Sequence, residues 1–360
     1  MQAVCQLPSL FVLCVTLLAI QTSYGAAHDA FPGKHWTQAG KAEDLGWSPK
    51  KLAEAKAYAD SIDTAAVIIV DDGIIVSQWG ATTTQFNVHS IRKSFLSALY
   101  GIAVEKGQVN LNATLEQLGK DDNAPSLTTV EKQARVIDLL KSRSGIYHPA
   151  LYESPAWRAR KPPRGSHPPR SFWLYNNWDF NALGTIYEKL TNDSIYHSFD
   201  AHIAKRIGME DYNFKGQEYF PGEDSIHRAY PFRMTARDMA RFGLLFLRAG
   251  TWRDAQVVPA NWVRESTTAY SVAEGDASYG YSGYGYLWWV AVNGNHILNV
   301  NLPDGSFSAQ GAGGHYIVVI PERKLVVVHR VNTDDPAKDV TGEQFGKLLG
   351  LILSAKKLND

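Results

Sequence analysis

The chain has 360 residues, of which 45% are hydrophobic and 20% charged, a balance typical of a globular protein with a large core. Lysine and arginine together number 36, as do aspartate and glutamate, so the formal net charge is zero. This balance gives no sign of binding to nucleic acid or to an anionic membrane surface.

The first 27 residues are typical of a secretory signal peptide. An apolar stretch at 10–20 is followed by small residues at 23–27, and it is too short to span a membrane comfortably. No lysine or arginine precedes the stretch, and an uncleaved apolar anchor is the alternative. We expect segment 1–27 to be removed, which leaves no membrane span and a secreted or periplasmic protein.

Metal and cofactor signals are missing from the mature chain. Both cysteines, Cys5 and Cys14, lie in the predicted signal peptide, which excludes disulfides and cysteine-based metal sites after its removal. His197 and His202 are five residues apart, off a common helical face, and we interpret them as surface residues. We expect no metal and no cofactor.

The ends of the mature chain are predicted to be rich in strands. Ser48 and Pro49 begin a helix, as N-cap and first-turn residue. Two apolar runs at 64–70 and 74–80, joined by an Asp-Asp-Gly turn, predict a β-hairpin. Further strands are expected at 284–292, 315–320 and 324–331, before a final helix at 341–357.

The middle of the chain, about 90 to 270, is predicted to be mainly helical with long loops, the helices being 91–107, 178–191 and 235–250. The simplest fold is α/β (α+β), with one antiparallel sheet formed from both chain ends, 28–85 and 280–360, and flanked by helices. Region 86–279 would be a mainly helical insertion. A ligand pocket would fall in the groove between the two parts.

Segment 154–173 differs from the rest of the chain because it holds five prolines and five basic residues. Proline disrupts helix interiors and central strands, so we expect a long exposed loop and no helix. Long ordered loops are often functional. The loop ends just before Tyr175.

Ser90 and Lys93 form the most informative of three Ser-x-x-Lys motifs. The other two, at Ser48 and Ser354, lie on solvent-facing helix positions. Ser90 precedes a helix that is apolar along much of its surface, which places Lys93 one turn from Ser90 on the same side. Burial would lower the lysine pKa toward that of a general base. The alternative is an N-cap serine and a lysine whose stem lies along the core.

Two further features favour chemistry at Ser90. Tyr175-Asn176-Asn177 is the only Tyr-x-Asn sequence in the chain, and segment 309–314 places glycines at the start of a strand. Glycine there permits the backbone to approach a ligand closely. Taken singly, each feature has a simpler explanation. The Tyr-x-Asn sequence could be a buried tyrosine with a capping asparagine, and the glycine segment could be a β-bulge.

Together, in this order and spacing, the three features resemble the serine β-lactamase and penicillin-binding-protein superfamily. The resemblance covers about 45 to 355 and is closest to the class C β-lactamase-like serine hydrolases, which include esterases and aminohexanoate-dimer hydrolase. It implies the β-lactamase-like fold. It also implies that Ser90 is the acylated nucleophile, and that Lys93 and Tyr175 transfer protons.

The same resemblance assigns the remaining site residues. Asn177 would orient Lys93 and substrate, and the backbone N–H groups of Ser90 and Ala312, beside Gly311, would form the oxyanion hole. The family's Lys-Thr-Gly motif aligns with Ala309-Gln310-Gly311, so the lysine and hydroxyl that bind the carboxylate of penicillins and D-Ala-D-Ala peptides are missing.

This departure favours a serine hydrolase that acts through an acyl-enzyme on ester or amide bonds of small or linear substrates. The alternatives are a β-lactamase or D-Ala-D-Ala carboxypeptidase, and a non-catalytic sensor or binding protein. We hypothesise that Arg164 or Arg170 steers a substrate carboxylate, although a solvated loop is the simpler explanation. Tyr147 is either a wall of the site or a core residue.

Overall fold

The computed structural model describes residues 30–273 and 282–357. The predicted signal peptide 1–27 and both cysteines therefore lie outside the described residues. Within the two described ranges, no helix combines the length and hydropathy that a membrane span requires.

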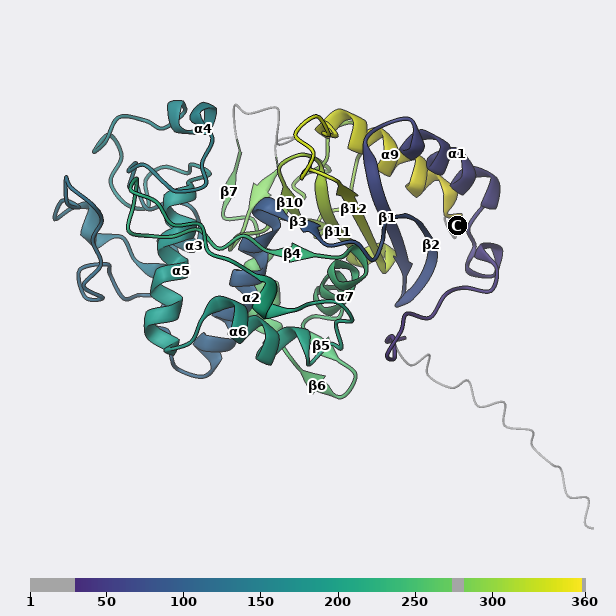
Figure 1. The fold of residues 1–360 in the computed structure, drawn as a ribbon, viewed down its shortest axis with the longest axis horizontal. Helices are drawn as coiled ribbons and strands as arrows, with labels where there is room; N and C mark the ends of the chain where they lie inside the picture. The colour runs from purple at the N-terminus through teal and green to yellow at the C-terminus, as the bar shows by residue number, and fades with distance from the viewer. Residues whose placement is uncertain (1–29, 274–281, 358–360) are drawn as a thin grey trace, which may run out of the picture.

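An antiparallel sheet lies at the centre of the fold (Figure 1). In the described residues it has eight strands in the order β2-β1-β12-β11-β10-β9-β8-β7. Because β1 pairs with β12, the two ends of the chain meet inside one sheet, and the expected α/β class is confirmed. The strands are β1 (Thr64–Asp71), β2 (Ile74–Gly80), β7 (Ser271–Val272), β8 (Gly283–Tyr284), β9 (Trp289–Val290), β10 (Phe307–Gly311), β11 (His315–Ile320) and β12 (Leu325–Val331).

Helices cover both faces of this sheet. In Figure 1, α1 (Pro49–Asp60) and α9 (Gly342–Ala355) lie side by side over one face. Helix α7 (Ala236–Leu247) packs against β1, β11 and β12 from the other face. A sheet buried on both sides needs apolar residues at every position, which explains the unbroken apolar run in β1.

The helical region packs around α2 (Arg92–Glu105), which is buried from Arg92 to Ala103. A helix that is apolar nearly all round belongs in the interior. The other elements of this part are α3 (Val136–Leu140), α4 (Pro155–Ala159), α5 (Asn177–Thr191), α6 (Ile195–Phe199), α8 (Ala260–Ser266), and the short pairs β3 (Phe86–Asn87) with β4 (Arg233–Met234) and β5 (Thr251–Trp252) with β6 (Ala255–Gln256).

Two predicted elements were wrong. The expected single strand 284–292 is a tight hairpin, in which Tyr284 pairs with Trp289 and the Gly285 N–H donates to the Trp288 carbonyl. The loop 154–173 contains the short helix α4. Pro155 occupies its first position, where no backbone donor is needed, and the Ser154 side chain accepts a hydrogen bond from the Trp157 N–H.

Candidate active site

Ser90 lies in a short 3₁₀ turn, His89–Ile91, directly before α2. The residue before it, His89, has a φ of +48°, a left-handed conformation that is uncommon for a side chain other than glycine. The Asn87 side chain accepts a hydrogen bond from the His89 N–H at 2.9 Å and helps to hold this turn. Backbone strain of this kind persists only where the surroundings enforce it.

The Lys93 amine is the centre of the site. Its Nζ lies 2.8 Å from Ser90 Oγ, 2.6 Å from the Tyr175 hydroxyl and 2.9 Å from Asn177 Oδ1. Lys93 is only 2% exposed. An uncharged amine satisfies all three contacts by donating to Tyr175 and Asn177 and accepting the hydroxyl proton of Ser90.

The protonation states fit this arrangement. Burial, with a smaller contribution from the neighbouring Arg92 guanidinium, lowers the pKa of Lys93 well below its usual value. Burial raises the pKa of Tyr175 to about 12, although a hydrogen bond with Ser90 partly offsets the rise. Tyr175 therefore keeps its proton near neutral pH, and the lowered pKa of Lys93 favours the lysine over the tyrosine as the base.

Tyr175 and Asn177 are held in place by the residue between them. Asn176 is the N-cap of α5, and its side chain accepts a hydrogen bond from the Trp178 N–H. Its Nδ2 donates to the Ile146 carbonyl at 2.7 Å and to Asp179 Oδ1 at 2.8 Å. The sequence left open whether Tyr-x-Asn merely supplies a helix-capping asparagine. Asn176 takes the capping position, whereas Asn177 contacts Lys93.

The glycine-rich segment forms the opposite wall. Gly311 ends β10, and the chain returns to β11 through Gly313 and Gly314, whose φ values are +80° and +92°. A Cβ on Gly311 would lie 2.4 Å from the Val88 carbonyl oxygen. The glycine is therefore required for close approach to the backbone that precedes Ser90.

Ser90, Tyr175, Gly311 and Ala312 line one cavity of about 350 Å³. Three side chains of the cavity wall were not predicted from the sequence, namely Trp157, Trp289 and Asp339. The two indoles pack on the Tyr175 ring at centroid distances of 5.6 and 5.4 Å. Trp157 comes from α4, in the proline-rich segment 154–173. The remaining lining residues are Gln310, Gly313, Gly314, Tyr316, Asp339, Val340, Thr341 and Gly342.

A buried network behind Ser90 was not anticipated from sequence. Arg330 of β12 donates to His315 Nδ1 at 2.9 Å and to both backbone carbonyls of β3, at 2.9 and 3.2 Å. The Thr333 hydroxyl lies 3.1 Å from His315 Nε2 and 2.8 Å from His89 Nε2. The network ties the turn that carries Ser90 to the central sheet.

Arg164, Arg170 and Tyr147 do not line this cavity. The Arg164 guanidinium forms a two-pronged ion pair with Glu131, at 2.9 and 2.7 Å, and so anchors its loop. Arg170 is exposed, and its backbone N–H donates to the Arg143 carbonyl. Tyr147 is buried, and its hydroxyl lies 3.1 Å from Nδ1 of His167, in loop 154–173.

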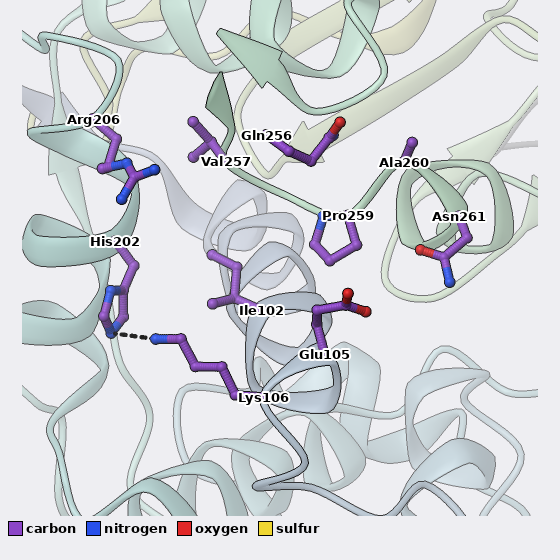
Figure 2. A pocket seen from close by; sticks show the side chains of 10 residues that line it. All are labelled: Ile102, Glu105, Lys106, His202, Arg206, Gln256, Val257, Pro259, Ala260 and Asn261. Carbon is purple, nitrogen blue, oxygen red and sulfur yellow. Dashed lines mark hydrogen bonds between the residues drawn. The ribbon is translucent and has the colours of Figure 1, made fainter. Parts of the chain in front are cut away.

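A second cavity, of about 450 Å³, lies at the far end of α2 and holds none of the predicted catalytic residues (Figure 2). His202 lines it, with Nε2 3.3 Å from Lys106 Nζ, whereas His197 contacts Asp193. Within the described ranges, no group of three or more potential metal ligands occurs.

Comparisons with solved structures place this geometry in a known fold. A candidate 6-aminohexanoate-dimer hydrolase from Bacillus anthracis is 20% identical with a TM-score of 0.63, covering 91% of this chain and 88% of that one. A beta-lactamase from Mycobacterium bovis is 19% identical with a TM-score of 0.58, covering 84% and 100%. A penicillin-binding protein from Bacillus halodurans is 15% identical with a TM-score of 0.61, covering 83% and 99%.

Sequence comparisons agree with this fold. An uncharacterized protein of Alkalihalophilus pseudofirmus is 20% identical over 301 residues, which are 75% of this chain and 84% of that protein. The family model for Beta-lactamase matches residues 50–350. The chain therefore belongs to the beta-lactamase family, in the superfamily of serine hydrolases to which the penicillin-binding proteins also belong.

Proposed function

We propose that the protein is a serine hydrolase that cleaves ester or amide bonds of small or linear substrates through an acyl-enzyme on Ser90. The observation that carries the proposal is the 2.8 Å contact between Ser90 Oγ and the buried amine of Lys93. A base whose pKa is lowered by burial can remove the serine proton near neutral pH.

The proposed reaction has two balanced steps. Lys93 takes the Ser90 proton as Oγ attacks the substrate carbonyl carbon, and the N–H groups of Ser90 and Ala312 receive the negative oxygen. Tyr175 passes a proton to the leaving group as the scissile bond breaks, and the ammonium of Lys93 restores the phenol. Water then loses a proton to the same pair and attacks the acyl carbon. The pair returns this proton to Ser90 Oγ as the acyl–oxygen bond breaks and the acid leaves.

Esters and linear amides are favoured over β-lactams by the walls of the cavity. Among the described residues that line it, none is lysine or arginine. Gln310, in the aligned position of the family threonine, donates through Nε2 to Ser308 Oγ at 3.0 Å. A substrate carboxylate of the kind found in penicillins and D-Ala-D-Ala peptides would thus enter without a cationic partner.

The test is turnover of p-nitrophenyl esters, with intact-protein mass spectrometry after incubation with an ester panel, a penicillin and a linear amide. We expect sustained turnover and an acyl adduct on Ser90 in the wild-type protein, and neither in Ser90→Ala. Ser354→Ala is the matched control, because Ser354 also begins a Ser-x-x-Lys motif but is exposed on α9, with its hydroxyl bonded to the Leu351 carbonyl.

Two outcomes would overturn the proposal. Full turnover in Ser90→Ala would exclude Ser90 as the nucleophile. A single stoichiometric burst of p-nitrophenol without later turnover would favour the alternative, a non-catalytic binding protein that is acylated but not released.

A further inference from the structure

We propose that the cavity beside Ser90 selects substrates that carry a cationic group, best a quaternary ammonium, and disfavours substrates that carry a carboxylate. The inference rests on the proposed function and adds the substrate class to it. Its basis is the charge and aromatic character of the cavity wall, neither of which follows from the catalytic residues.

Asp339 supplies the charge. It is the one carboxylate among the described lining residues, and none of those residues is lysine, arginine or histidine. Its side chain forms no hydrogen bond or ion pair with any residue in the described ranges. The adjacent Lys338 does not neutralise it, because Lys338 Nζ is bonded to Asp63 at 2.8 Å. The carboxylate of Asp339 is therefore available to a ligand.

Two observations place this carboxylate beside the β10–β11 hairpin, which forms part of the cavity wall. A Cβ built on Gly313 would lie 3.7 Å from Asp339 Oδ1, so the carboxylate lies over the turn that follows Ala312. The same charge adds to the effect of burial in raising the pKa of Tyr316 to about 12. Tyr316 pairs with Gln310 across the β10–β11 hairpin, which also leads to the predicted oxyanion donor.

Aromatic rings complete the recognition surface. Trp157 and Trp289 both line the cavity, and they come from separate parts of the chain. A cation is attracted to the face of an indole ring, and a quaternary ammonium uses this attraction without losing hydrogen bonds. A cavity lined by both a carboxylate and indole rings suits a bulky organic cation.

Several positive groups lie near this wall without lining the cavity. The Arg160 guanidinium already contacts one of the two indoles, at 4.7 Å from the centre of the Trp157 ring. Lys93 does not line the cavity, and burial lowers its pKa well below the usual value. Arg92 is 1% exposed and does not line the cavity; its guanidinium donates to Asn181 Oδ1 and lies over the Tyr230 ring. Asp339 is exposed and is the one charged side chain among the described residues that line the cavity.

Three p-nitrophenyl esters of similar length isolate the effect of charge: the 4-(trimethylammonio)butyrate, its neutral isostere 5,5-dimethylhexanoate, and the monoester of glutarate. We expect kcat/KM to fall in that order for the wild-type protein. In Asp339→Asn, the ratio of the cationic to the neutral ester should fall about 3- to 10-fold, the effect of one unit charge at close range in a wet site. Added salt should reduce the wild-type ratio.

Asp335→Asn is the matched control. It removes the same charge from the same exposed loop, but Asp335 accepts a hydrogen bond from the Ala337 N–H and does not line the cavity. We expect its ester ratios to match those of the wild-type protein. An unchanged ratio in Asp339→Asn, or an equal fall in both variants, would overturn the inference while leaving the hydrolase intact.

A binding measurement separates this inference from the proposed function. Butyltrimethylammonium chloride contains no bond to hydrolyse, and its binding is measured by the change in tryptophan fluorescence in Ser90→Ala protein. We expect the binding to saturate and its Kd to rise at least 3-fold when Asp339→Asn is introduced into the Ser90→Ala protein. This result would support the cation site even if no ester is turned over. The absence of saturable binding, together with no preference among the esters, would exclude it.

Discussion

The backbone of Gly311 lies against the carbonyl oxygen of Val88, two residues before Ser90. Strand β10 and the turn that carries the nucleophile are therefore in direct contact, with no side chain between them. This contact sets the distance between Ser90 and the Ala312 N–H, the two groups proposed to receive the oxyanion. Small displacements at such a place have large effects on rate.

Gly311→Ala should therefore reduce activity more than it reduces stability. The added methyl group would lie 2.4 Å from the Val88 oxygen, so one of the two backbones must move. We expect kcat/KM to fall about 100-fold, the cost of a displacement of roughly 1 Å at a reacting centre. Gly216→Ala is the control, because nothing lies within 4 Å of a Cβ there. Wild-type kcat/KM in Gly311→Ala would contradict the role given to this contact.

Asn177→Asp should move the pH profile without destroying the site. A carboxylate at the position of Asn177 Oδ1, 2.9 Å from Lys93 Nζ, would stabilise the ammonium form and raise the lysine pKa. Because the base must be uncharged, the acid limb of the kcat/KM profile should shift about 1–3 units to higher pH.

The measurement is kcat/KM for a p-nitrophenyl ester across pH in the wild-type protein, Asn177→Asp and Asn177→Ala. We expect Asn177→Asp to regain activity at pH values above its shifted acid limb. An activity loss that is the same at every pH, or that equals the loss in Asn177→Ala, would contradict a Lys93 base.

Buried histidines should make the protein sensitive to acid. Burial is the main cause that lowers the pKa of His89, His227 and His329 to about 4, and of His296 to about 3. Their usual value is near 6.5, so the unfolded chain binds more protons than the folded one. The stability they contribute is complete above pH 6.5 and is lost as the pH falls from there toward 4.

Urea unfolding at pH 7.5 and pH 5 measures this loss. His296→Leu removes one buried titrating group, and we expect its stability to fall less between the two pH values than that of the wild-type protein. The difference should be on the order of 2 kcal/mol, since one pKa unit corresponds to about 1.4 kcal/mol and protonation is partial at pH 5. An identical fall in both proteins would contradict the lowered pKa of His296.

Much of the fold could be predicted from sequence, since its signals are local. The apolar runs of β1 and β2, and the Ser-x-x-Lys motif before an apolar helix, each lie in one short segment. The hairpin β8–β9 was missed because its loop, 285–288, is Gly-Tyr-Leu-Trp and lacks the usual turn residues after the glycine.

The unpredicted parts of the site depend on long-range contacts. Asp339 and Trp157 meet the same cavity from loops 182 residues apart, and neither belongs to a periodic pattern. Arg330 reaches β3 across 244 residues. A loop residue carries no sequence signal for the cavity it faces, so only the folded chain reveals these groups.

Arg164 should contribute to stability and not to substrate selection. Its guanidinium bonds Glu131, whose side chain is 4% exposed, and donates to the carbonyls of Pro125 and Ser126. Arg164→Ala would leave that nearly buried carboxylate without its cationic partner, although the Thr128 N–H would still donate to Oε2 at 2.7 Å, and the loss should cost about 1–3 kcal/mol. Arg164→Lys keeps the charge but loses the two-pronged geometry, so its melting temperature should lie between those of the wild-type protein and Arg164→Ala.

The ratio of kcat/KM for the glutarate monoester to that for its neutral analogue distinguishes anchoring from steering. We expect this ratio to be unchanged in Arg164→Ala and Arg164→Lys, because Arg164 does not line the cavity. Arg170→Ala, at an exposed position of the same loop, should change neither the ratio nor the melting temperature. A lower ratio in Arg164→Ala at unchanged melting temperature would instead make Arg164 a steering residue, since a loop anchor cannot act on substrate charge without acting on stability.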